Sequence, residues 1–467
     1  TPKRFRQFLV FIKRDILKKL SDTQYLIINF LEAPFLAFLL AFIVKYYSVS
    51  VTNKFGYTIS ENSNMPVYIF MSVIVAIFMG LTVSAEEIIK DRKILKREAF
   101  LNLSWSGYLF SKVGVQFALS AIQAATFVIV GNSIMEIKGM YFEYWVVLFS
   151  SWAAANVMGL LISDSFKTVV TIYILIPFLV IPQIILSGII VKFENLNPQI
   201  STPSRIPIYG EIITARWAYE ALATYQFMEN DYQKNFYLAE KVKSVSEFKS
   251  NFLLKNLQNK LVVVTENYKD SEQADLVSGH LDLLRNELGK EYKSRLVFKN
   301  YHEGVPGYKM KYLDRLKLGE INDTVLTYTD EYLTALSKAY TDIYREAFRE
   351  SNAIKQQFDL EELQEMKRKH HNDALADFVT NKNDFEKIVE YKGQLIQKSS
   401  PIYLDPTSKF IKAHFYAPRK MIFGTFIRTL WANVIIIWLM TIILYILLYF
   451  RVLKKFLDLM ENLSRKK

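Results

Sequence analysis

Long apolar runs alternate along this chain with densely charged stretches. Six of the runs are close to the length of about 20 residues that a helix needs to cross the hydrocarbon core of a bilayer. They are residues 25–46, 67–85, 108–135, 144–162, 168–191 and 423–450. The pattern predicts an all-α polytopic membrane protein with six transmembrane helices, five of them between residues 23 and 191 and the sixth at 423–450.

The first 22 residues follow a helical period without becoming uniformly apolar. Apolar side chains recur every three or four positions, and basic residues fill most of the others. The apolar positions are Phe5, Phe8, Leu9, Ile12, Ile16 and Leu20. This pattern is typical of a helix lying in the membrane interface beside anionic lipid, and a helix packed on a protein core is the alternative. We expect residues 1–22 to be an interfacial amphipathic helix.

Basic residues mark one side of the predicted membrane domain. They are dense in residues 1–22, in the loop 86–104 and in the tail 451–467, whereas the loops after the first and third spans carry only Lys54 and Lys138. Short loops rich in Lys and Arg stay in the cytoplasm. The distribution therefore predicts that both termini are cytoplasmic, as an even number of spans requires.

A long hydrophilic segment, residues 192–422, separates the fifth and sixth spans. The same orientation places it outside the cytoplasm. Amphipathic stretches such as Ala274–Leu288 predict a large, mainly helical extracytoplasmic domain, with short strands expected at Lys260–Thr265 and Arg295–Phe298. Because the chain begins at Thr1 and not at Met, we expect it to be part of a longer or processed polypeptide.

Composition removes several classes of function. The net charge of +12 would suggest nucleic acid for a soluble protein, but basic flanks of membrane spans explain it, so no nucleic-acid partner is expected. The absence of cysteine excludes disulfides and thiolate metal sites within this sequence. Gly289 and Lys290 precede Glu291 without the upstream glycine of a phosphate-binding loop. We expect no catalytic residue, metal site or cofactor within this chain.

Three polar side chains inside the spans are candidates for function. Asn29 and Glu32 lie three apart on one face of the first span, and Gln183 lies in the fifth. Polar groups at membrane depth usually face a bundle interior or an aqueous cavity. They could line a substrate cavity, or they could simply form hydrogen bonds or ion pairs between helices.

The loop after the second span carries charges of both signs. Its charged residues are Glu86, Glu87, Lys90, Asp91, Arg92, Lys93, Lys96, Arg97 and Glu98. This density fits a solvated loop, or a helix that docks on a soluble partner through charge pairs that fix its orientation.

Four segments in this order resemble the membrane half of G-subfamily ABC exporters, within the ABC-2 permease class. Lys96-Arg97-Glu98 is similar to the Arg-Glu of the family's coupling helix, and Ala153–Ser163 to its small-residue fourth span. Ile181–Gly188 is similar to the end of its fifth span, and Ala215–Leu222 to the short outer helices that follow. The likeness covers residues 1–227 and 423–450.

The resemblance implies a mechanism and partners. Two permease halves, expected to be a homodimer, would form a cavity lined in part by Asn29 and Glu32, with substrate leaving near Gln183, Leu186 and Gly188. A nucleotide-binding domain, fused or separate, would bind ATP and Mg and supply the ATPase activity. The residues expected to couple this domain to the spans are Glu86, Glu87, Arg92, Arg97 and Glu98. The expected substrate is hydrophobic or amphipathic: a lipid, peptide or drug-like compound exported by alternating access.

Two features depart from that family. The nucleotide-binding domain is not in this sequence, and residues 192–422 far exceed the family's usual outer loop. We expect the protein in the cytoplasmic (inner) membrane of a bacterium, in contact with lipid and with a possible periplasmic partner. The alternative is a membrane-anchored extracytoplasmic scaffold, or a mechanical signalling protein, that translocates nothing.

Overall fold

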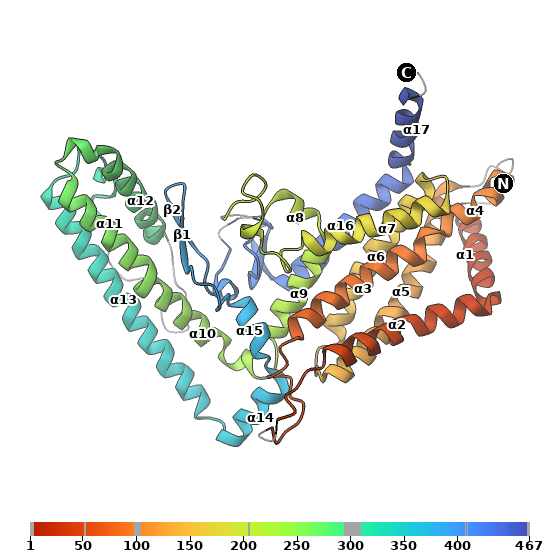
Figure 1. Cartoon of the computed structure of the whole chain (residues 1–467), viewed down its shortest axis with the longest axis horizontal. Coiled ribbons are helices and arrows are strands. Elements are labelled where there is room, and N and C mark those ends of the chain that lie inside the picture. The colour runs from red at the N-terminus through yellow and green to blue at the C-terminus, as the bar shows by residue number, and fades with distance from the viewer. Residues whose placement is uncertain are drawn as a thin grey trace.

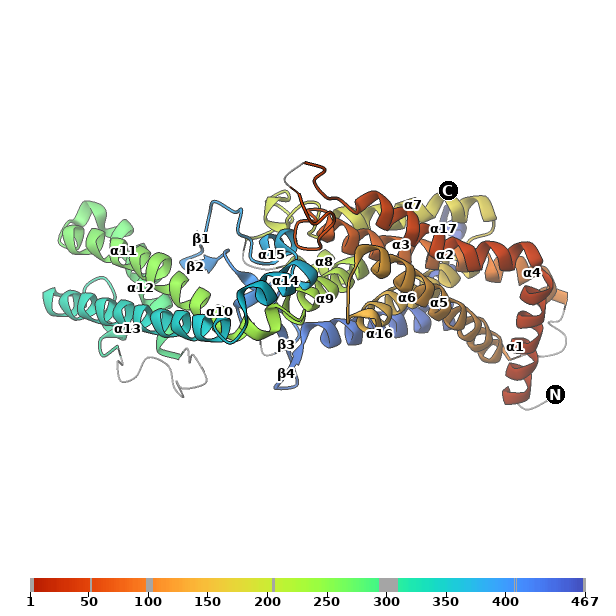
Figure 2. The same ribbon diagram turned by 90° about the horizontal axis from the view of Figure 1, so that it is seen from below.

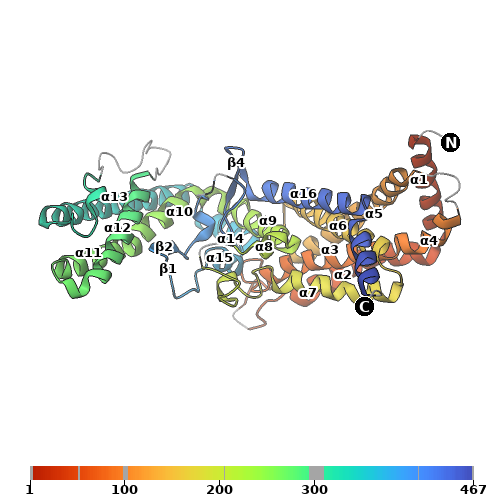
Figure 3. The ribbon, with the colours of Figure 1, turned by 90° about the horizontal axis from the view of Figure 1, so that it is seen from above.

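A computed structural model describes most of the chain as a helical bundle with a long arm projecting from one end (Figure 1). The described residues are 4–50, 53–97, 104–203, 206–293, 310–406, 408 and 410–464. Both termini lie at the end of the bundle away from the arm (Figures 1 and 3). We call the two ends of the bundle the termini end and the arm end.

The bundle contains the predicted spans. Its helices are α1 (Arg4–Ser21), α2 (Thr23–Val44), α3 (Met65–Ala85), α4 (Glu87–Arg97), α5 (Trp105–Met135), α6 (Tyr141–Ser165), α7 (Val169–Ile185), α16 (Thr429–Tyr449) and α17 (Val452–Ser464). Within the described residues, the helices long and apolar enough to cross a membrane include α2, α3, α5, α6 and α16, and α7 is apolar but has only 17 residues. Counting α7 gives the even number of crossings that termini at one end require. The prediction of an all-α polytopic membrane protein is confirmed.

The last span is shorter than its apolar run. Residues 423–450 were expected to form one helix, but Thr425–Arg428 is strand β4, which pairs antiparallel with β3 (Arg419–Ile422). Phe423 and Gly424 turn the chain between the strands with φ values of 48° and 82°, as a two-residue hairpin turn requires. The helix therefore begins at Thr429.

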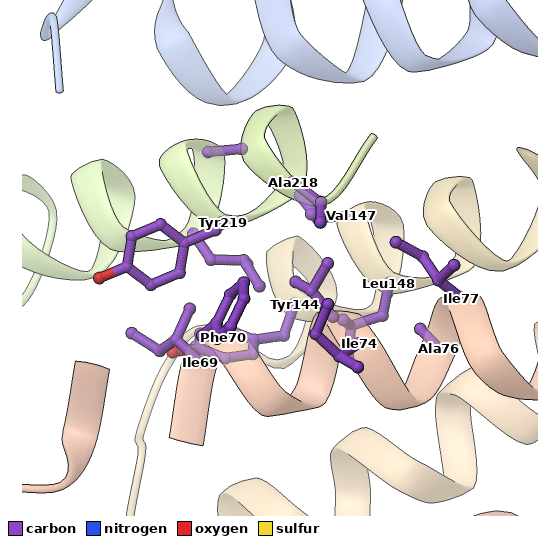
Figure 4. Close-up of a cluster of buried hydrophobic side chains, with 14 of the residues drawn as sticks. Ile69, Phe70, Ile74, Ala76, Ile77, Tyr144, Val147, Leu148, Ala218 and Tyr219 are labelled. Atoms are coloured by element: carbon purple, nitrogen blue, oxygen red, sulfur yellow. The ribbon is translucent and has the colours of Figure 1, made fainter. Parts of the chain in front are cut away.

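α3 and α6 form the centre of the bundle. A Cβ atom on Gly80 would lie 2.7 Å from the Ala155 Cβ, and one on Gly159 would lie 2.0 Å from the Ser84 Oγ. Because these glycines have no side chain, the two helices approach closely, as membrane helices with small residues do. Figure 4 shows the arm end of this core, where side chains of α3 and α6 meet Ala218 and Tyr219.

Residues 192–422 form the arm and the elements that attach it. Its helices are α8 (Ile208–Ile212), α9 (Thr214–Met228), α10 (Gln233–Phe248), α11 (Leu254–Asn267), α12 (Ala274–Lys293), α13 (Asp323–Lys355), α14 (Leu360–His370) and α15 (Asp373–Val379). A hairpin of β1 (Ile388–Tyr391) and β2 (Gln394–Gln397) follows. A π-helical turn at Lys249–Leu253 joins α10 to α11, and 3₁₀ turns lie at Phe193–Asn195, Ser271–Gln273, Leu313–Arg315 and Pro401–Tyr403.

The arm has an apolar core of its own between α10, α11, α12 and α13, which extend away from the bundle (Figure 2). The strand expected at Lys260–Thr265 is wrong, because these residues lie within α11. Leu257, Leu261 and Val264 form one buried helical face there, so the three-to-four period overrides the local β-branched run. The strand expected at Arg295–Phe298 lies outside the described residues.

Hydrogen bonds fix the arm to the loop between α2 and α3. The Asn372 Nδ2 donates to the carbonyl oxygens of Ile59 and Asn62, at 2.6 and 2.8 Å. The Asp373 amide donates to the Ser60 carbonyl at 3.1 Å. Because Asn372 is buried and also caps α15, the base of the arm is anchored to the first loop of the bundle.

Candidate functional site

The charged helix α4 lies at the termini end, joined to the end of α6. The Ser163 Oγ accepts hydrogen bonds from the amides of Ile88 and Ile89, both at 3.0 Å. These are first-turn amides, which have no partner within the helix itself. A residue of α6 therefore caps the start of α4.

Arg92 of α4 in turn donates hydrogen bonds to the C-terminal end of α6. Its Nη2 lies 3.0, 2.9 and 2.8 Å from the carbonyl oxygens of Ser163, Asp164 and Phe166. These carbonyls lie at the C-terminal end of α6, where a helix leaves acceptors unsatisfied and where its dipole favours a cation. Ser163 of α6 thus accepts from the free amides at the start of α4, and Arg92 of α4 donates to the free carbonyl oxygens at the end of α6.

Lys112 of α5 is the centre of a buried ion cluster. Its Nζ lies 2.5 Å from the Asp15 Oδ1 of α1, and 2.9 Å from both the Glu87 Oε2 and the Asp91 Oδ2 of α4. Only 2% of the Lys112 side chain is exposed. One ammonium group therefore connects α1, α4 and α5.

Two lysines of α1 complete this cluster. The Lys18 Nζ donates to the Asp91 Oδ1 at 3.0 Å, and the Lys19 Nζ donates to the Glu87 Oε1 at 2.5 Å. The cluster of Asp15, Lys18, Lys19, Glu87, Asp91 and Lys112, which we call the lysine cluster, contains three acids and three amines. The Lys18 side chain is 56% exposed, but the other charges of the cluster are largely buried, and buried charges are tolerated only when they are paired in this way.

The opposite face of α4 is exposed and cationic. Its exposed residues are Lys90, Lys93, Lys96 and Arg97. Glu86, just before the helix, forms an ion pair with Lys90. The acids of α4 thus point into the bundle together with Arg92, and its other bases point out.

The expected coupling residues therefore divide into separate roles. Glu87 and Arg92 hold α4 onto the bundle, whereas Arg97 is exposed on its outer face. Glu98 lies outside the described residues. Lys112 was not selected from the sequence as a site residue, although a lysine within an apolar span signals an acidic partner.

The two candidates on α2 lie near the termini end. The Asn29 Nδ2 donates to the Tyr25 carbonyl at 2.9 Å, and the Asn29 carbonyl accepts from the Gln123 Nε2 of α5 at 3.1 Å. Asn29 therefore participates in a helix–helix contact. Glu32 is half-buried, and within the described part of the chain it forms no ion pair.

The other three candidates lie at the arm end of α7. The Gln183 Oε1 accepts a hydrogen bond from the Ala215 amide at 3.0 Å, which ties α7 to the start of α9. Leu186 caps the C-terminal end of α7, and Gly188 follows with a φ of +79°. Figure 1 shows that α2 begins at the termini end of the bundle and that α7 ends at its arm end, so the five candidates fall into two groups within one chain.

A second buried ionic group joins α9 to the last span. The Lys420 Nζ lies 2.6 Å from the Glu220 Oε2 and 2.8 Å from the Asn433 Oδ1. The Asn433 Nδ2 donates to the Trp217 carbonyl at 2.9 Å. Among the described residues no cluster of three or more His, Asp or Glu side chains is arranged to bind a metal ion.

Comparison with known proteins finds matches to about the first half of the chain, which contains α4 and its contacts. Residues 6–227 match the ABC-2 type transporter family model. The ABC transporter ATP-binding/permease protein Rv1747 of Mycobacterium tuberculosis is 28% identical over 234 residues, covering 47% of this chain and 25% of that protein. The chain thus spans about a quarter of the length of this relative.

The matched region runs from the first turn of α1 to the last turn of α9, and hence includes α4 and all six residues of the lysine cluster. It ends at Phe227, before α10 and the rest of the arm. The chain is therefore a multi-pass membrane protein whose residues 6–227 are similar to the ABC-2 type transporter family, and this match supports an ABC-2 class transmembrane component.

Proposed function

We propose that this chain is the permease part of an ATP-driven exporter. It moves a hydrophobic or amphipathic substrate out of the cytoplasm or the inner leaflet by alternating access. The observation that carries this proposal is the two-faced α4: its acidic face is locked into the bundle by Lys112 and Ser163, and its cationic face is exposed. Such a helix can receive a force from a partner and pass it to the spans.

The charges favour an acidic partner surface. Lys90, Lys93, Lys96 and Arg97 give α4 four exposed cations, so a groove lined by carboxylates on the ATPase domain or subunit would orient it. That partner binds ATP and Mg and supplies hydrolysis. This chain provides the helix that moves.

The lysine cluster makes α4 move together with its neighbours. Separating one partner from a buried ion pair costs about 3–5 kcal/mol, and Lys112 has three such contacts. A push on α4 is therefore passed to α1 and α5 before these contacts break. The joint between Arg92 and the end of α6 extends the moving unit to the centre of the bundle.

The proposed setting follows from the distribution of charge. The basic helices α1 and α4 lie at the termini end, which we place in the cytoplasm of a bacterial inner membrane. The arm is then periplasmic, where it could meet a further partner. A second copy of the chain completes the translocation path, because the candidate cavity residues of one copy do not converge.

Charge reversal on the outer face of α4 tests this proposal. Since the sequence has no cysteine, the single substitution Ile185→Cys reports thiol accessibility at the arm end of α7. In the complex with its ATPase, ATP should change this labelling. Adding K93E and R97E should abolish the change while leaving the fold intact.

The matched control is R345E, which reverses an exposed charge on the arm at α13. It should leave the ATP-dependent labelling unchanged. Labelling that responds fully to ATP with K93E and R97E present would refute the role of α4. Labelling that never responds to ATP, in any background, would favour the scaffold alternative.

A further inference from the structure

A cavity of about 330 Å³ lies where the C-terminal end of α7 meets the elements that attach the arm. Its lining comes from segments far apart in the sequence, including Gly188 and Ile189 after α7, Phe378 of α15, Ile396 of β2, and Phe415. The cavity therefore exists only because residues 192–422 fold back against the end of the fifth span.

Aromatic rings form one wall of this cavity. The Phe193 ring occupies the space that a side chain on Gly188 would need, since a Cβ there would lie 2.3 Å from the ring. Phe193 also packs edge-on against Phe415, with ring centroids 5.9 Å apart. The wall is thus rigid and apolar, which suits a hydrocarbon ligand.

The charged groups around the cavity are already paired. Lys398 forms an ion pair with Glu194, and the Lys192 Nζ lies 3.2 Å from Asp384. Asp377 is paired with Lys382 at 3.4 Å. These pairs neutralise the charges at the lining, so the cavity favours an uncharged, apolar group over an anion or a cation.

His414, which also lines the cavity, forms a hydrogen bond with the backbone. Its Nε2 donates to the Pro401 carbonyl oxygen at 2.8 Å. Burial lowers the pKa of this imidazole below its usual value, so the ring adds no positive charge at neutral pH.

Exposed isoleucines surround the same end of α7. Ile190, Ile208 and Ile212 are 63%, 82% and 67% exposed. Exposed apolar side chains beside the end of a span mark a surface that lipid or protein covers. The cavity therefore lies next to the boundary between the bilayer and the arm.

We infer that this cavity binds the acyl chain of a single-chain amphiphile, leaving the polar head of the molecule in water. Its volume is near the lower end of the range of about 300–1,000 Å³ for ligand pockets, which favours one chain over a diacyl lipid. The inference rests on the proposed function only for its direction, namely that the ligand arrives from the end of α7. Binding itself requires no ATPase.

Photolabelling tests the inference directly. The probe is lysophosphatidylcholine with a diazirine on its acyl chain, added to the full chain in nanodiscs, and labelled peptides are mapped by mass spectrometry. Label should concentrate on the segments that line the cavity, around Ile189, Ile396 and Phe415.

Two substitutions in separate lining segments, I189W after α7 and I396W in β2, fill the cavity and should each reduce this labelling about tenfold. The matched control is I190W, one position along, where the side chain is exposed and tryptophan is acceptable at a membrane interface. It should keep the labelling. Melting curves identify any variant that fails to fold. If I189W or I396W does not fold, the labelling of the other one tests the inference.

Labelling spread evenly over the lipid-facing helices, or equal in I189W, I396W and I190W, would overturn the inference. The proposed function fails separately. If cavity labelling is present but α7 never responds to ATP, the cavity stands and the exporter proposal falls. If α7 responds to ATP but the cavity takes no label, only this inference is lost.

Discussion

Replacing Lys112 with methionine removes the central charge of the lysine cluster while keeping a side chain of similar length. The Lys112 ammonium contacts Asp15, Glu87 and Asp91 at 2.5, 2.9 and 2.9 Å. Lys18 and Lys19 remain on Asp91 and Glu87. Asp15 is then left with neither carboxylate oxygen paired, since its Oδ2 already has no partner.

The expected loss follows from that uncompensated charge. Breaking a buried pair by removing one partner costs about 3–5 kcal/mol. K112M should therefore lower the free energy of unfolding by about that amount and weaken the attachment of α1 to α4 and α5. Adding D15N removes the unpaired charge, so the double variant should recover most of the loss.

The assay is a double-mutant cycle on the purified full-length protein, with K112M, D15N and the double variant compared by thermal or denaturant unfolding. A coupling energy of about 2 kcal/mol or more between the two positions is expected, since contacting residues couple by up to about 3 kcal/mol. Wild-type stability in K112M, or losses that simply add in the double variant, would refute the assignment of the cluster.

Three further predictions concern the arm end. G188A should shift the Phe193 ring into the 330 Å³ cavity, because Gly188 has a φ of +79° and its Cβ would lie 2.3 Å from that ring; reduced lysolipid labelling with an unchanged lysine cluster checks this. K420M should destabilise the protein by about 3–5 kcal/mol because it removes the nearer cation of the buried Glu220, at 2.6 Å, and leaves Arg216 at 3.8 Å; adding E220Q should restore melting towards wild type. Burial lowers the pKa of His371 below its usual value. Below about pH 6.5 the unfolded chain therefore binds a proton that the folded chain does not, and the free energy of unfolding should decrease as the pH is lowered. H371Q should remove part of this pH dependence.

The spans could be predicted because hydropathy over about 20 residues is a local property. The short strand β4 was missed because Phe426 and Ile427 continue the apolar run into α16, and only pairing with Met421 and Lys420 reveals a hairpin. Pairing of this kind depends on tertiary context.

The candidate site was predictable only in part. The sequence shows that α4 is charged, and its acids and bases repeat with a helical period: Glu87 with Asp91, and Lys93 with Arg97. Which face is buried is decided by Lys112, which lies 25 positions beyond Glu87. No local pattern contains that information.

The position of the arm was equally hidden from local patterns. It depends on Asn372, which bonds to carbonyls more than 300 positions earlier. The cavity beside Gly188 follows from this folding back, so it could not have been inferred from the segment around Gly188 alone.

The central claim is that α4 moves with α1 and α5 as one unit when the ATPase partner binds ATP. Distances between spin labels on engineered cysteines test it most directly, with one label on α4 at Ile94→Cys and the second on α5 at Phe110→Cys or on α7 at Ile174→Cys. When ATP is trapped, the α4–α5 distance should stay constant and the α4–α7 distance should change. A changed α4–α5 distance with a constant α4–α7 distance would contradict it.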